Sequence, residues 1–369
     1  MHTSRLQQLI LNRVIDTLGE DAHEKRTIAE FEPIFFQAED HVVKNIHLLD
    51  AETERSARWS LKYGRKRRAR SAAHNERAIL KKLGCGFRHF ADAVTLAEDA
   101  NRDLFVDSAQ WLRDSGPSSA SLIAQNGVGG APLHVLIMLG MHARGCVIAS
   151  EIDMLARKGY TEGAHARARS LYELMILVAF IAEKETADFE LTERYHLSAL
   201  VERRKDARHM GEEDPFDSED GLEQALRNRW GSGFFQSYGW ASLGMQGRSS
   251  SSRVTFRDIE ESTGLDGMRH CYLTMNHAIH GGAMAITTRF DRRNPFRNVT
   301  GSEVNHYSIA WVMGAAAKFF HCLNRITLQA VSDLVDPEQV FYLTPLAHCD
   351  SAEDFFWEYA ISHEPDQEN

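Results

Sequence analysis

Cysteine and proline are scarce in this chain of 369 residues, which contains 5 cysteines and 8 prolines. The cysteines are dispersed along the chain, and no two of them form a CxxC pair. An odd, dispersed set of thiols argues against a framework of disulfide bonds. We therefore expect reduced thiols and a cytoplasmic protein.

Long hydrophobic runs are also missing. The longest runs extend over about a dozen residues, whereas a helix needs about 20 apolar residues to cross a bilayer. The apolar run near the N-terminus contains Arg13 and Asp16, which are foreign to the apolar part of a signal peptide. We therefore expect neither a secretory leader nor a membrane span.

Several motifs of known chemistry are absent. The glycines at 126–132 have no GxxxxGK[ST] pattern and follow no predicted strand, which excludes a phosphate-binding P-loop. There is no GxSxG motif and no cysteine beside an obvious base, which argues against a serine or cysteine nucleophile. No repeat of fixed period is present, which argues against a solenoid.

The charge that is present has an uneven distribution. The net charge of −10 argues against general affinity for nucleic acid, because phosphate binding needs a local excess of cations. Arginine far outnumbers lysine, which favours bidentate pairing with carboxylate or phosphate groups. The basic run Lys62–Arg70 is the local exception. It forms either a contact for phosphate groups or a solvated helix or loop surface, and the pattern favours the second interpretation.

Hydrophobic periodicity predicts an all-α protein, a multi-helix bundle with an irregular insertion rich in glycine, serine and aromatic residues. Apolar residues recur with helical spacing, and sustained strand-like alternation is nearly absent. Helices are expected over residues 4–18, 28–49, 86–114, 132–158, 162–184, 188–209, 256–262, 267–290, 303–335, 337–347 and 351–362, with a short helix starting near 219. Long helices with apolar stripes often pair between subunits, so we expect a homodimer.

Glycine and serine mark the predicted boundaries between regions. We predict an N-terminal helical region over 1–115, a linker over 116–131, and a C-terminal helical bundle over 132–369. The irregular insertion within the bundle covers 211–255. Its large rings favour docking on the end of the bundle over stacking on bases; they are Trp230, Phe234, Phe235, Tyr238 and Trp240.

The sequence of residues 162–185 predicts a helix around which the rest of the chain is organised. Apolar residues surround its axis after Leu171, which is typical of a buried helix. Arg169 and Glu173 are four residues apart and therefore lie on one face. A cation and an anion at the edge of a core need partners.

The predicted helix 267–290 carries a second polar face. Arg269, Tyr272, Asn276 and His280 follow one another at intervals of three or four residues, which places them on one inward side. Burying four polar groups is costly unless they pair with each other or with a ligand. We predict that this face meets Arg169 and Glu173 in a shared pocket.

Two other interpretations of these polar groups stay open. In the first interpretation, the polar side chains form a buried network that fixes the register of the helices and has no further role. Alternatively, His277 and His280 bind a metal together with Glu173 or His165, although an HxxH spacing alone is a weak indication. The first of these is favoured on composition, and the metal site is the least favoured of the three.

Several segments in order resemble an uncharacterised bacterial family, the domain of unknown function 5677. They are RARSLYELMILVAFIAE (167–183), ERYHLSALVERR (193–204), SYGWAS (237–242) and VTFRDIEESTGLDGMRHCYLTMNHAIHGG (254–282). The family shows an Arg…Glu helix, a YGWA-like stretch and a Tyr-x-x-x-[Ser/Asn]-x-x-x-His helix in this order. The resemblance covers roughly residues 130–290, and the order of the short pieces carries it.

By analogy, the family resembles HEPN-type helical domains of abortive-infection and toxin ribonucleases. The resemblance implies a metal-independent ribonuclease or effector of bacterial stress or phage defence, with RNA as substrate and no cofactor. Arg169, Arg269 and His280 would be catalytic, and Glu173, Tyr272 and Asn276 would orient them. A protein encoded nearby is an expected partner. The alternative is a non-enzymatic helical sensor or scaffold whose polar pocket binds a ligand or partner protein.

The spacing of arginine and histidine departs from the HEPN pattern, in which four to six residues separate the two. Seven residues separate Arg269 from His277, and ten separate Arg269 from His280. Arg204 and His209 match the spacing, but so many arginines and histidines produce such matches by chance.

Overall fold

The computed structural model describes most of the chain from residue 51 onward. The described residues are 13–14, 33–34, 36–38, 40–41, 51–115, 130–185, 189–213, 221–245, 253–277, 279, 283, 290–291, 294–298, 304–332 and 343–363. They divide into two compact units, Met1–Ser71 and Ala72–Asn369. The division lies within the long helix α3 (Ala51–Ser115).

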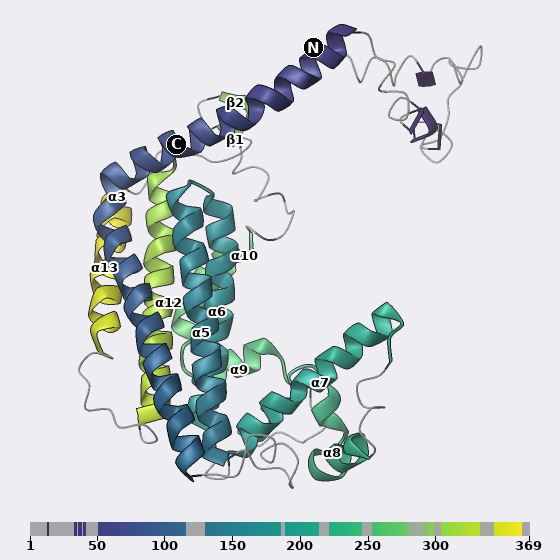
Figure 1. The fold of residues 1–369 in the computed structure, drawn as a ribbon, viewed down its shortest axis with the longest axis vertical. Coiled ribbons are helices and arrows are strands. Elements are labelled where there is room, and N and C mark those ends of the chain that lie inside the picture. The colour runs from purple at the N-terminus through teal and green to yellow at the C-terminus, as the bar shows by residue number, and fades with distance from the viewer. Residues whose placement is uncertain are drawn as a thin grey trace. The chain divides into compact units, whose positions relative to one another are not determined.

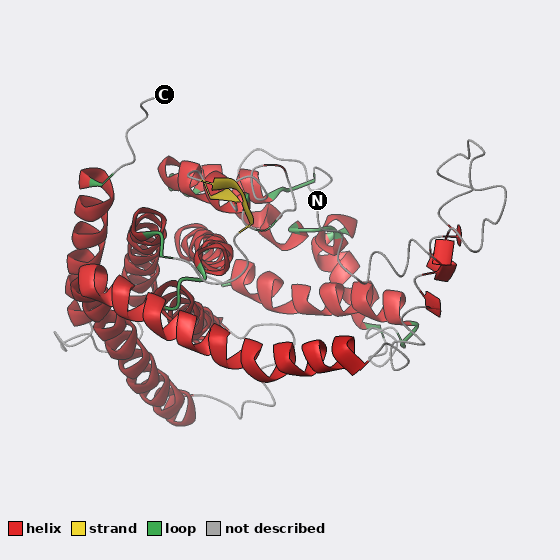
Figure 2. Ribbon diagram, turned by 90° about the horizontal axis from the view of Figure 1, so that it is seen from above, coloured by secondary structure: helices red, strands yellow, loops and turns green. Residues whose placement is uncertain are grey.

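Nearly all described residues are helical, so the predicted all-α fold is confirmed (Figure 1, Figure 2). The strands found within the described ranges are β1 (Phe290–Asp291) and β2 (Asn294–Asn298), which form one antiparallel pair. The helices that form the bundle with α3 are α5 (Gly130–Arg157), α6 (Thr161–Lys184), α12 (His306–Ser332) and α13 (Thr344–Ser362). The intervening segment forms the helices α7 (Glu190–Met210), α8 (Leu222–Trp230), α9 (Phe256–Ser262) and α10 (Arg269–Asn276), and the short 3-10 helices η3 (Ser232–Phe235), η4 (Gly239–Gly244) and η5 (Asp266–Met268).

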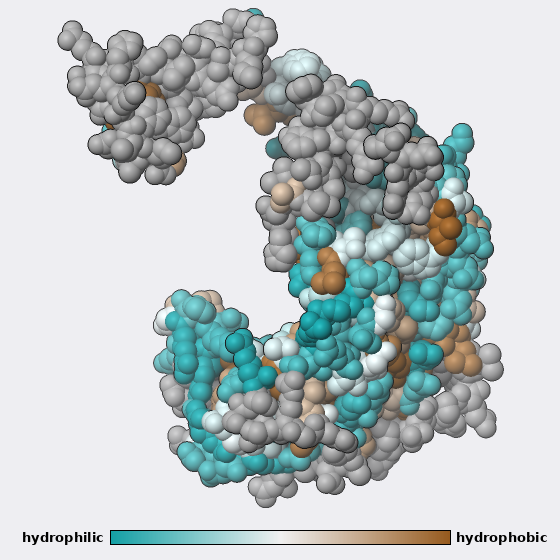
Figure 3. Space-filling model, turned by 180° about the vertical axis from the view of Figure 1, so that it is seen from behind, coloured by the Kyte–Doolittle hydropathy of each residue, from teal (hydrophilic) through white to brown (hydrophobic). Residues whose placement is uncertain are grey.

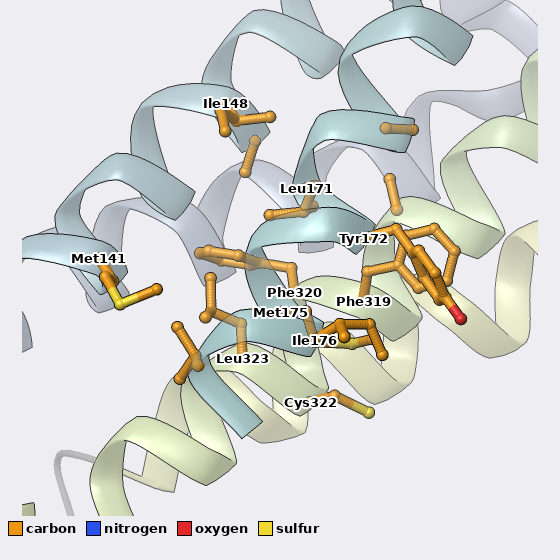
Figure 4. Packing of buried hydrophobic residues seen from close by; sticks show 14 of the residues in the cluster. Met141, Ile148, Leu171, Tyr172, Met175, Ile176, Phe319, Phe320, Cys322 and Leu323 are labelled. Atoms are coloured by element: carbon orange, nitrogen blue, oxygen red, sulfur yellow. The ribbon is translucent and has the colours of Figure 1, made fainter. Parts of the chain in front are cut away.

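Helix α6 packs against both α5 and α12 in the unit Ala72–Asn369, and these two helices also contact each other (Figure 1). Its apolar residues face several neighbours because they surround the helix axis, as the sequence predicts. Figure 4 shows Leu171, Met175 and Ile176 of α6 in contact with side chains from α5 and α12. Each of these three side chains is fully buried, so α6 is held from several sides and cannot rotate without losing this packing.

The second half of α3 belongs to the same core. Phe87 packs edge-on against Phe356 of α13 at 5.3 Å, and Phe90 lies 6.1 Å from Phe320 of α12. Residues 72–115 thus group with the C-terminal helices, and the compact units divide between Ser71 and Ala72. Most of the linker predicted at 116–131 lies outside the described residues, which resume at Gly130.

Three predicted helix boundaries are wrong. The helix expected over 267–290 ends at Asn276, ahead of a glycine pair at 281–282 that disfavours a helix, and Phe290 lies in β1. Within the described residues, the helices expected over 337–347 and 351–362 join into the single helix α13, which has Pro345 in its first turn; residues 337–342 lie outside the described residues. The helix expected from residue 86 is part of α3, which begins at Ala51 and includes the basic run.

One helix is apolar enough to invite a membrane interpretation. Within the described residues, the segment Leu133–Arg157 of α5 is long and apolar enough to span a bilayer. The core helix of a soluble protein meets the same criterion, and 56% of the residues in the apolar window are buried inside the structure. The face drawn in Figure 3 is mostly hydrophilic, with hydrophobic residues scattered over it.

A buried histidine connects three helices of the core. His142 of α5 lies 3.0 Å from the side-chain nitrogen of Asn101 and 2.8 Å from the side-chain oxygen of Asn324. A neutral ring with its proton on Nε2 satisfies both contacts, because Nδ1 accepts from Asn101 and Nε2 donates to Asn324. Burial lowers the pKa of His142, and it lowers the pKa of His134 to about 4.

These histidines predict a loss of stability in acid. A depressed pKa favours the neutral ring in the folded state, so the unfolded chain binds protons first as the pH falls below about 6.5. The free energy of unfolding should therefore fall from pH 6.5 downward, by roughly 3 kcal/mol for His134 by pH 4. Urea denaturation at pH 7 and pH 5 measures this change.

The variant His142→Gln should show a smaller drop in stability between these two pH values than the wild type. His209→Gln is the matched control, because His209 is exposed on α7. An equal pH dependence in the wild type, His142→Gln and His209→Gln would contradict the assignment of the acid response to the buried ring.

Candidate functional site

Arg169 and Glu173 form an ion pair on the surface-facing side of α6. The guanidinium Nη2 lies 2.9 Å from the Glu173 carboxylate, across one turn of the helix. The side chains are 21% and 36% exposed, so the pair lies at the edge of the core and solvent reaches it. The neighbouring residues on α6 anchor the pair, since Leu171 and Tyr172 are fully buried.

Tyr272 of α10 completes a three-residue cluster with this ion pair. The Arg169 Nη2 donates to the Tyr272 hydroxyl at 3.1 Å, and that hydroxyl donates to Glu173 at 3.2 Å. The guanidinium also lies 5.1 Å from the centre of the tyrosine ring. The structure thus brings together a cation, a carboxylate and a phenol from two helices about a hundred residues apart in sequence, as the predicted shared pocket requires. Their catalytic role stays a prediction.

Two further rings line this cluster. Phe256 of α9 lies 5.7 Å from Tyr272, and Tyr238 lies 6.5 Å from Phe256. Burial raises the pKa of Tyr238, and the negative charge of Glu173 raises it further, so the phenol stays protonated. Tyr238 has a φ of 55°, a left-handed conformation that costs a non-glycine residue about 1–3 kcal/mol and that clusters at functional sites.

Arg269 makes a different contact from the one predicted. Its Nη1 forms an ion pair with Glu260 of α9, whose side chain is fully buried. The other Glu260 oxygen accepts a hydrogen bond of 2.6 Å from Tyr172. The ring of Tyr172 lies 5.3 Å from that of Tyr272, so this second network is adjacent to the cluster. Arg269 therefore supports the site by neutralising a buried carboxylate.

The other residues predicted for the site are Asn276, His280 and His277. Asn276 is half-buried, and its side-chain oxygen has no hydrogen-bond partner among the residues that the structure describes. His280 lies outside the described residues, so its predicted place beside Arg169 stays a prediction. His277 is exposed at the end of α10. Within the described parts of the chain, no three His, Cys, Asp or Glu side chains gather as metal ligands.

The aromatic insertion docks on the bundle as predicted, and Arg194 of α7 holds it there. Arg194 is 4% exposed and donates to the carbonyl oxygens of Gly239 and Trp240 at 2.6 and 2.9 Å. It also donates to Ser242 Oγ at 2.6 Å. Burial lowers the pKa of Arg194 to about 10, so it stays a cation at neutral pH. This cation fixes the segment that carries Tyr238.

Arg204 has a structural contact that accounts for its charge. Its guanidinium pairs with Glu223 of α8 at 2.6 Å, while His209 is exposed. Glu223 also pairs with Arg227, and hydrogen bonds from Arg204 and Arg227 lower the pKa of this carboxyl to about 2. The arginine of the Arg204–His209 match is therefore engaged in an ion pair between α7 and α8.

Sequence reasoning did not single out Glu260 or Arg194. Glu260 lies four residues after Phe256, on the apolar side of a short helix. A carboxylate in that position was the available signal of a buried ion pair. Arg194 gave no such signal, because its partners are mainly backbone carbonyls 45 to 46 residues away. Such contacts depend on the fold and leave no pattern in residue types.

Residues 135–297 match a family of unknown function, DUF5677. The match confirms the resemblance found in the sequence, and it includes every residue of the Arg169–Glu173–Tyr272 cluster. Comparisons of the chain with curated proteins and with solved structures give no match.

Proposed function

We propose that the DUF5677 region is an HEPN-like, metal-independent ribonuclease or effector in bacterial stress or phage defence. The observation that supports this proposal is the convergence of Arg169, Glu173 and Tyr272 at a solvent-accessible edge of the core. A cation, a general base and a hydrogen-bond donor are the groups that cleavage of an RNA phosphodiester requires.

Each residue of the cluster has a role in this chemistry. Glu173 accepts the proton of the RNA 2′-hydroxyl, whose oxygen then attacks the adjacent phosphorus. Arg169 and Tyr272 stabilise the negative charge that develops on the phosphoryl oxygens. The bond to the 5′-oxygen breaks, leaving a 2′,3′-cyclic phosphate, and His280 is the proposed proton donor to that oxygen.

Activity requires that substrate displaces part of the existing pairing. The Arg169 guanidinium already contacts both Glu173 and Tyr272, and its buried Nε has no partner among the described residues. A phosphate group would release Glu173 from the ion pair and leave the carboxylate free to act as a base. An activating signal, such as a partner protein encoded nearby, would act by favouring this rearrangement.

The variant Glu173→Gln should reduce RNA cleavage by about 100-fold or more, because it removes the general base while retaining the shape of the side chain. The assay mixes purified protein with total RNA in excess EDTA, with and without infected-cell extract. Glu261→Gln is the matched control, since Glu261 forms an i,i+4 pair with Arg257 on the exposed face of α9 and should leave cleavage unchanged. RNA that stays intact under all these conditions would refute the ribonuclease proposal.

A non-enzymatic sensor or scaffold is the second candidate, and one observation favours it. The charges of both arginines are already neutralised, Arg169 by Glu173 and Arg269 by Glu260. A pocket with internally balanced charge suits a neutral ligand or a partner protein. If the protein is a sensor or scaffold, its effector phenotype should survive the substitution His280→Gln. If it is a ribonuclease, the same substitution should abolish the phenotype. Sedimentation of the purified chain tests the homodimer expected in either case.

A further inference from the structure

The first part of α3 carries a concentration of positive charge unlike the rest of the chain. We call residues 51–71 the basic arm; they lie in the unit Met1–Ser71. From Arg55 to Ser71 the arm contains eight Arg and Lys residues and no Asp or Glu, while the whole chain has a net charge of −10. All eight basic side chains are exposed. The acidic remainder of the protein repels polyanions, so any contact with a polyanion is directed to this arm.

The arm has an ordered stripe of cations and rings along one side. Arg55, Trp59, Lys62, Lys66 and Arg70 succeed one another at intervals of three or four residues, so they share one face of the helix. This stripe is about 22 Å long at a rise of about 1.5 Å per residue.

Two aromatic rings on this face have no core to fill. Trp59 is 59% exposed and Tyr63 is 42% exposed, and their ring centres lie 5.2 Å apart. The Lys62 ammonium lies 5.5 Å from the centre of the Tyr63 ring. Adjacent exposed rings interleaved with cations form a surface on which unpaired bases can stack while phosphates contact the cations.

We propose that the basic arm binds single-stranded nucleic acid. Its Arg and Lys residues neutralise the phosphates, and Trp59 and Tyr63 stack on unpaired bases. An anionic membrane fits less well, because an interfacial helix needs a continuous apolar face. Leu61 and Trp59 are two residues apart and so point to different sides, and Arg67 and Arg68 occupy the faces beyond the stripe. A duplex offers the rings no unpaired base.

This inference does not depend on the proposed function. The probe is a fluorescent single-stranded DNA of about 20 thymidines, a length that covers the site of a typical single-strand binding module. Because DNA lacks the 2′-hydroxyl, the proposed cleavage chemistry cannot destroy the probe. Binding is followed by fluorescence anisotropy of the full-length protein at about 50 to 300 mM salt.

The first variant combines Arg65→Gln, Lys66→Gln, Arg67→Gln and Arg68→Gln. Glutamine favours a helix nearly as well as lysine and arginine, so the arm should keep its structure, which circular dichroism checks. We expect affinity to fall roughly 100-fold at about 0.1 M salt. The slope of log affinity against log salt should become shallower by about 3, from four charges at about 0.7 each.

The matched control replaces four exposed basic residues elsewhere in the chain, Lys81, Lys82, Arg88 and Arg144, with glutamine. It changes the net charge equally and should retain wild-type affinity. Wild-type affinity in the arm variant, or an equal loss in the control, would overturn the proposal.

The second variant, Trp59→Leu with Tyr63→Leu, tests the rings. It should weaken binding of the single strand by about tenfold or more and leave the affinity for a duplex of the same length unchanged. A stronger affinity of the wild type for the duplex, or binding to vesicles with about one-third phosphatidylserine in the absence of nucleic-acid binding, would also overturn the proposal.

Discussion

The variant Arg269→Ala should lose about 3–5 kcal/mol of folding stability, the largest effect of a single substitution that we expect. The reason is the fully buried carboxylate of Glu260, whose ion-pair partner is Arg269. Without the guanidinium, Glu260 remains charged in the core with only the hydroxyl of Tyr172 as a donor among the described residues. An unpaired buried charge is far more costly than a missing surface contact. Urea denaturation at pH 7 measures the loss.

The double variant Arg269→Ala with Glu260→Gln provides the decisive comparison. Glutamine keeps an acceptor for the Tyr172 hydroxyl and removes the buried charge, so we expect it to recover about half or more of the lost stability. Arg257→Ala serves as the control, because solvent screens the exposed Arg257–Glu261 pair, which should contribute little to folding stability. Equal losses for Arg269→Ala and Arg257→Ala would show that the Glu260 network is not a source of stability.

The variant Arg194→Ala should detach the segment 231–245 from α7. Three acceptors lose the Arg194 donor, namely the carbonyl oxygens of Gly239 and Trp240 and the hydroxyl of Ser242, although the Gly239 carbonyl keeps a hydrogen bond from Ser242. An unsatisfied buried group costs about 1–3 kcal/mol, so we expect a total loss of about 2–4 kcal/mol. Hydrogen exchange should show the largest increase in η3 and η4.

Two companion variants separate the causes of this effect. Arg194→Lys keeps the charge but not the planar fork of donors, so it should recover only part of the loss. Arg203→Ala removes an exposed arginine of the same helix and should leave hydrogen exchange unchanged. Strong protection of η3 and η4 in Arg194→Ala would mean that ring packing alone holds the segment.

Gly239 should be equally intolerant of a side chain. A Cβ at this position would overlap the carbonyl oxygen of Gly233 and lie 2.6 Å from that of Phe234. Both atoms belong to the backbone and cannot turn away. The YGWA segment thus combines a glycine that allows close approach, a tryptophan buried against Phe180 and Tyr195, and a tyrosine whose ring lies 6.5 Å from that of Phe256 beside the candidate site.

The candidate site was predicted in part from local spacing. Arg169 and Glu173 had to lie on one face because they are four residues apart in a helix. Tyr272 was expected opposite them, and the contact is present. Arg269 was expected in the same cluster but pairs with Glu260 of α9, whose carboxylate is fully buried. A carboxylate inside the core attracts a nearby cation more strongly than a solvent-exposed carboxylate does, because the interior screens charges less than water.

The amino-acid sequence by itself determined the helical class, the burial of α6 and the position of its ion pair at the edge of the core. These follow from a period of 3.6 residues, which is a local property of the chain. Only the tertiary structure decided that Glu260 binds Arg269, that Arg194 holds the aromatic segment, and that His142 joins Asn101 to Asn324. These contacts join helices distant in sequence, so they depend on how the helices pack in space, which no local spacing encodes.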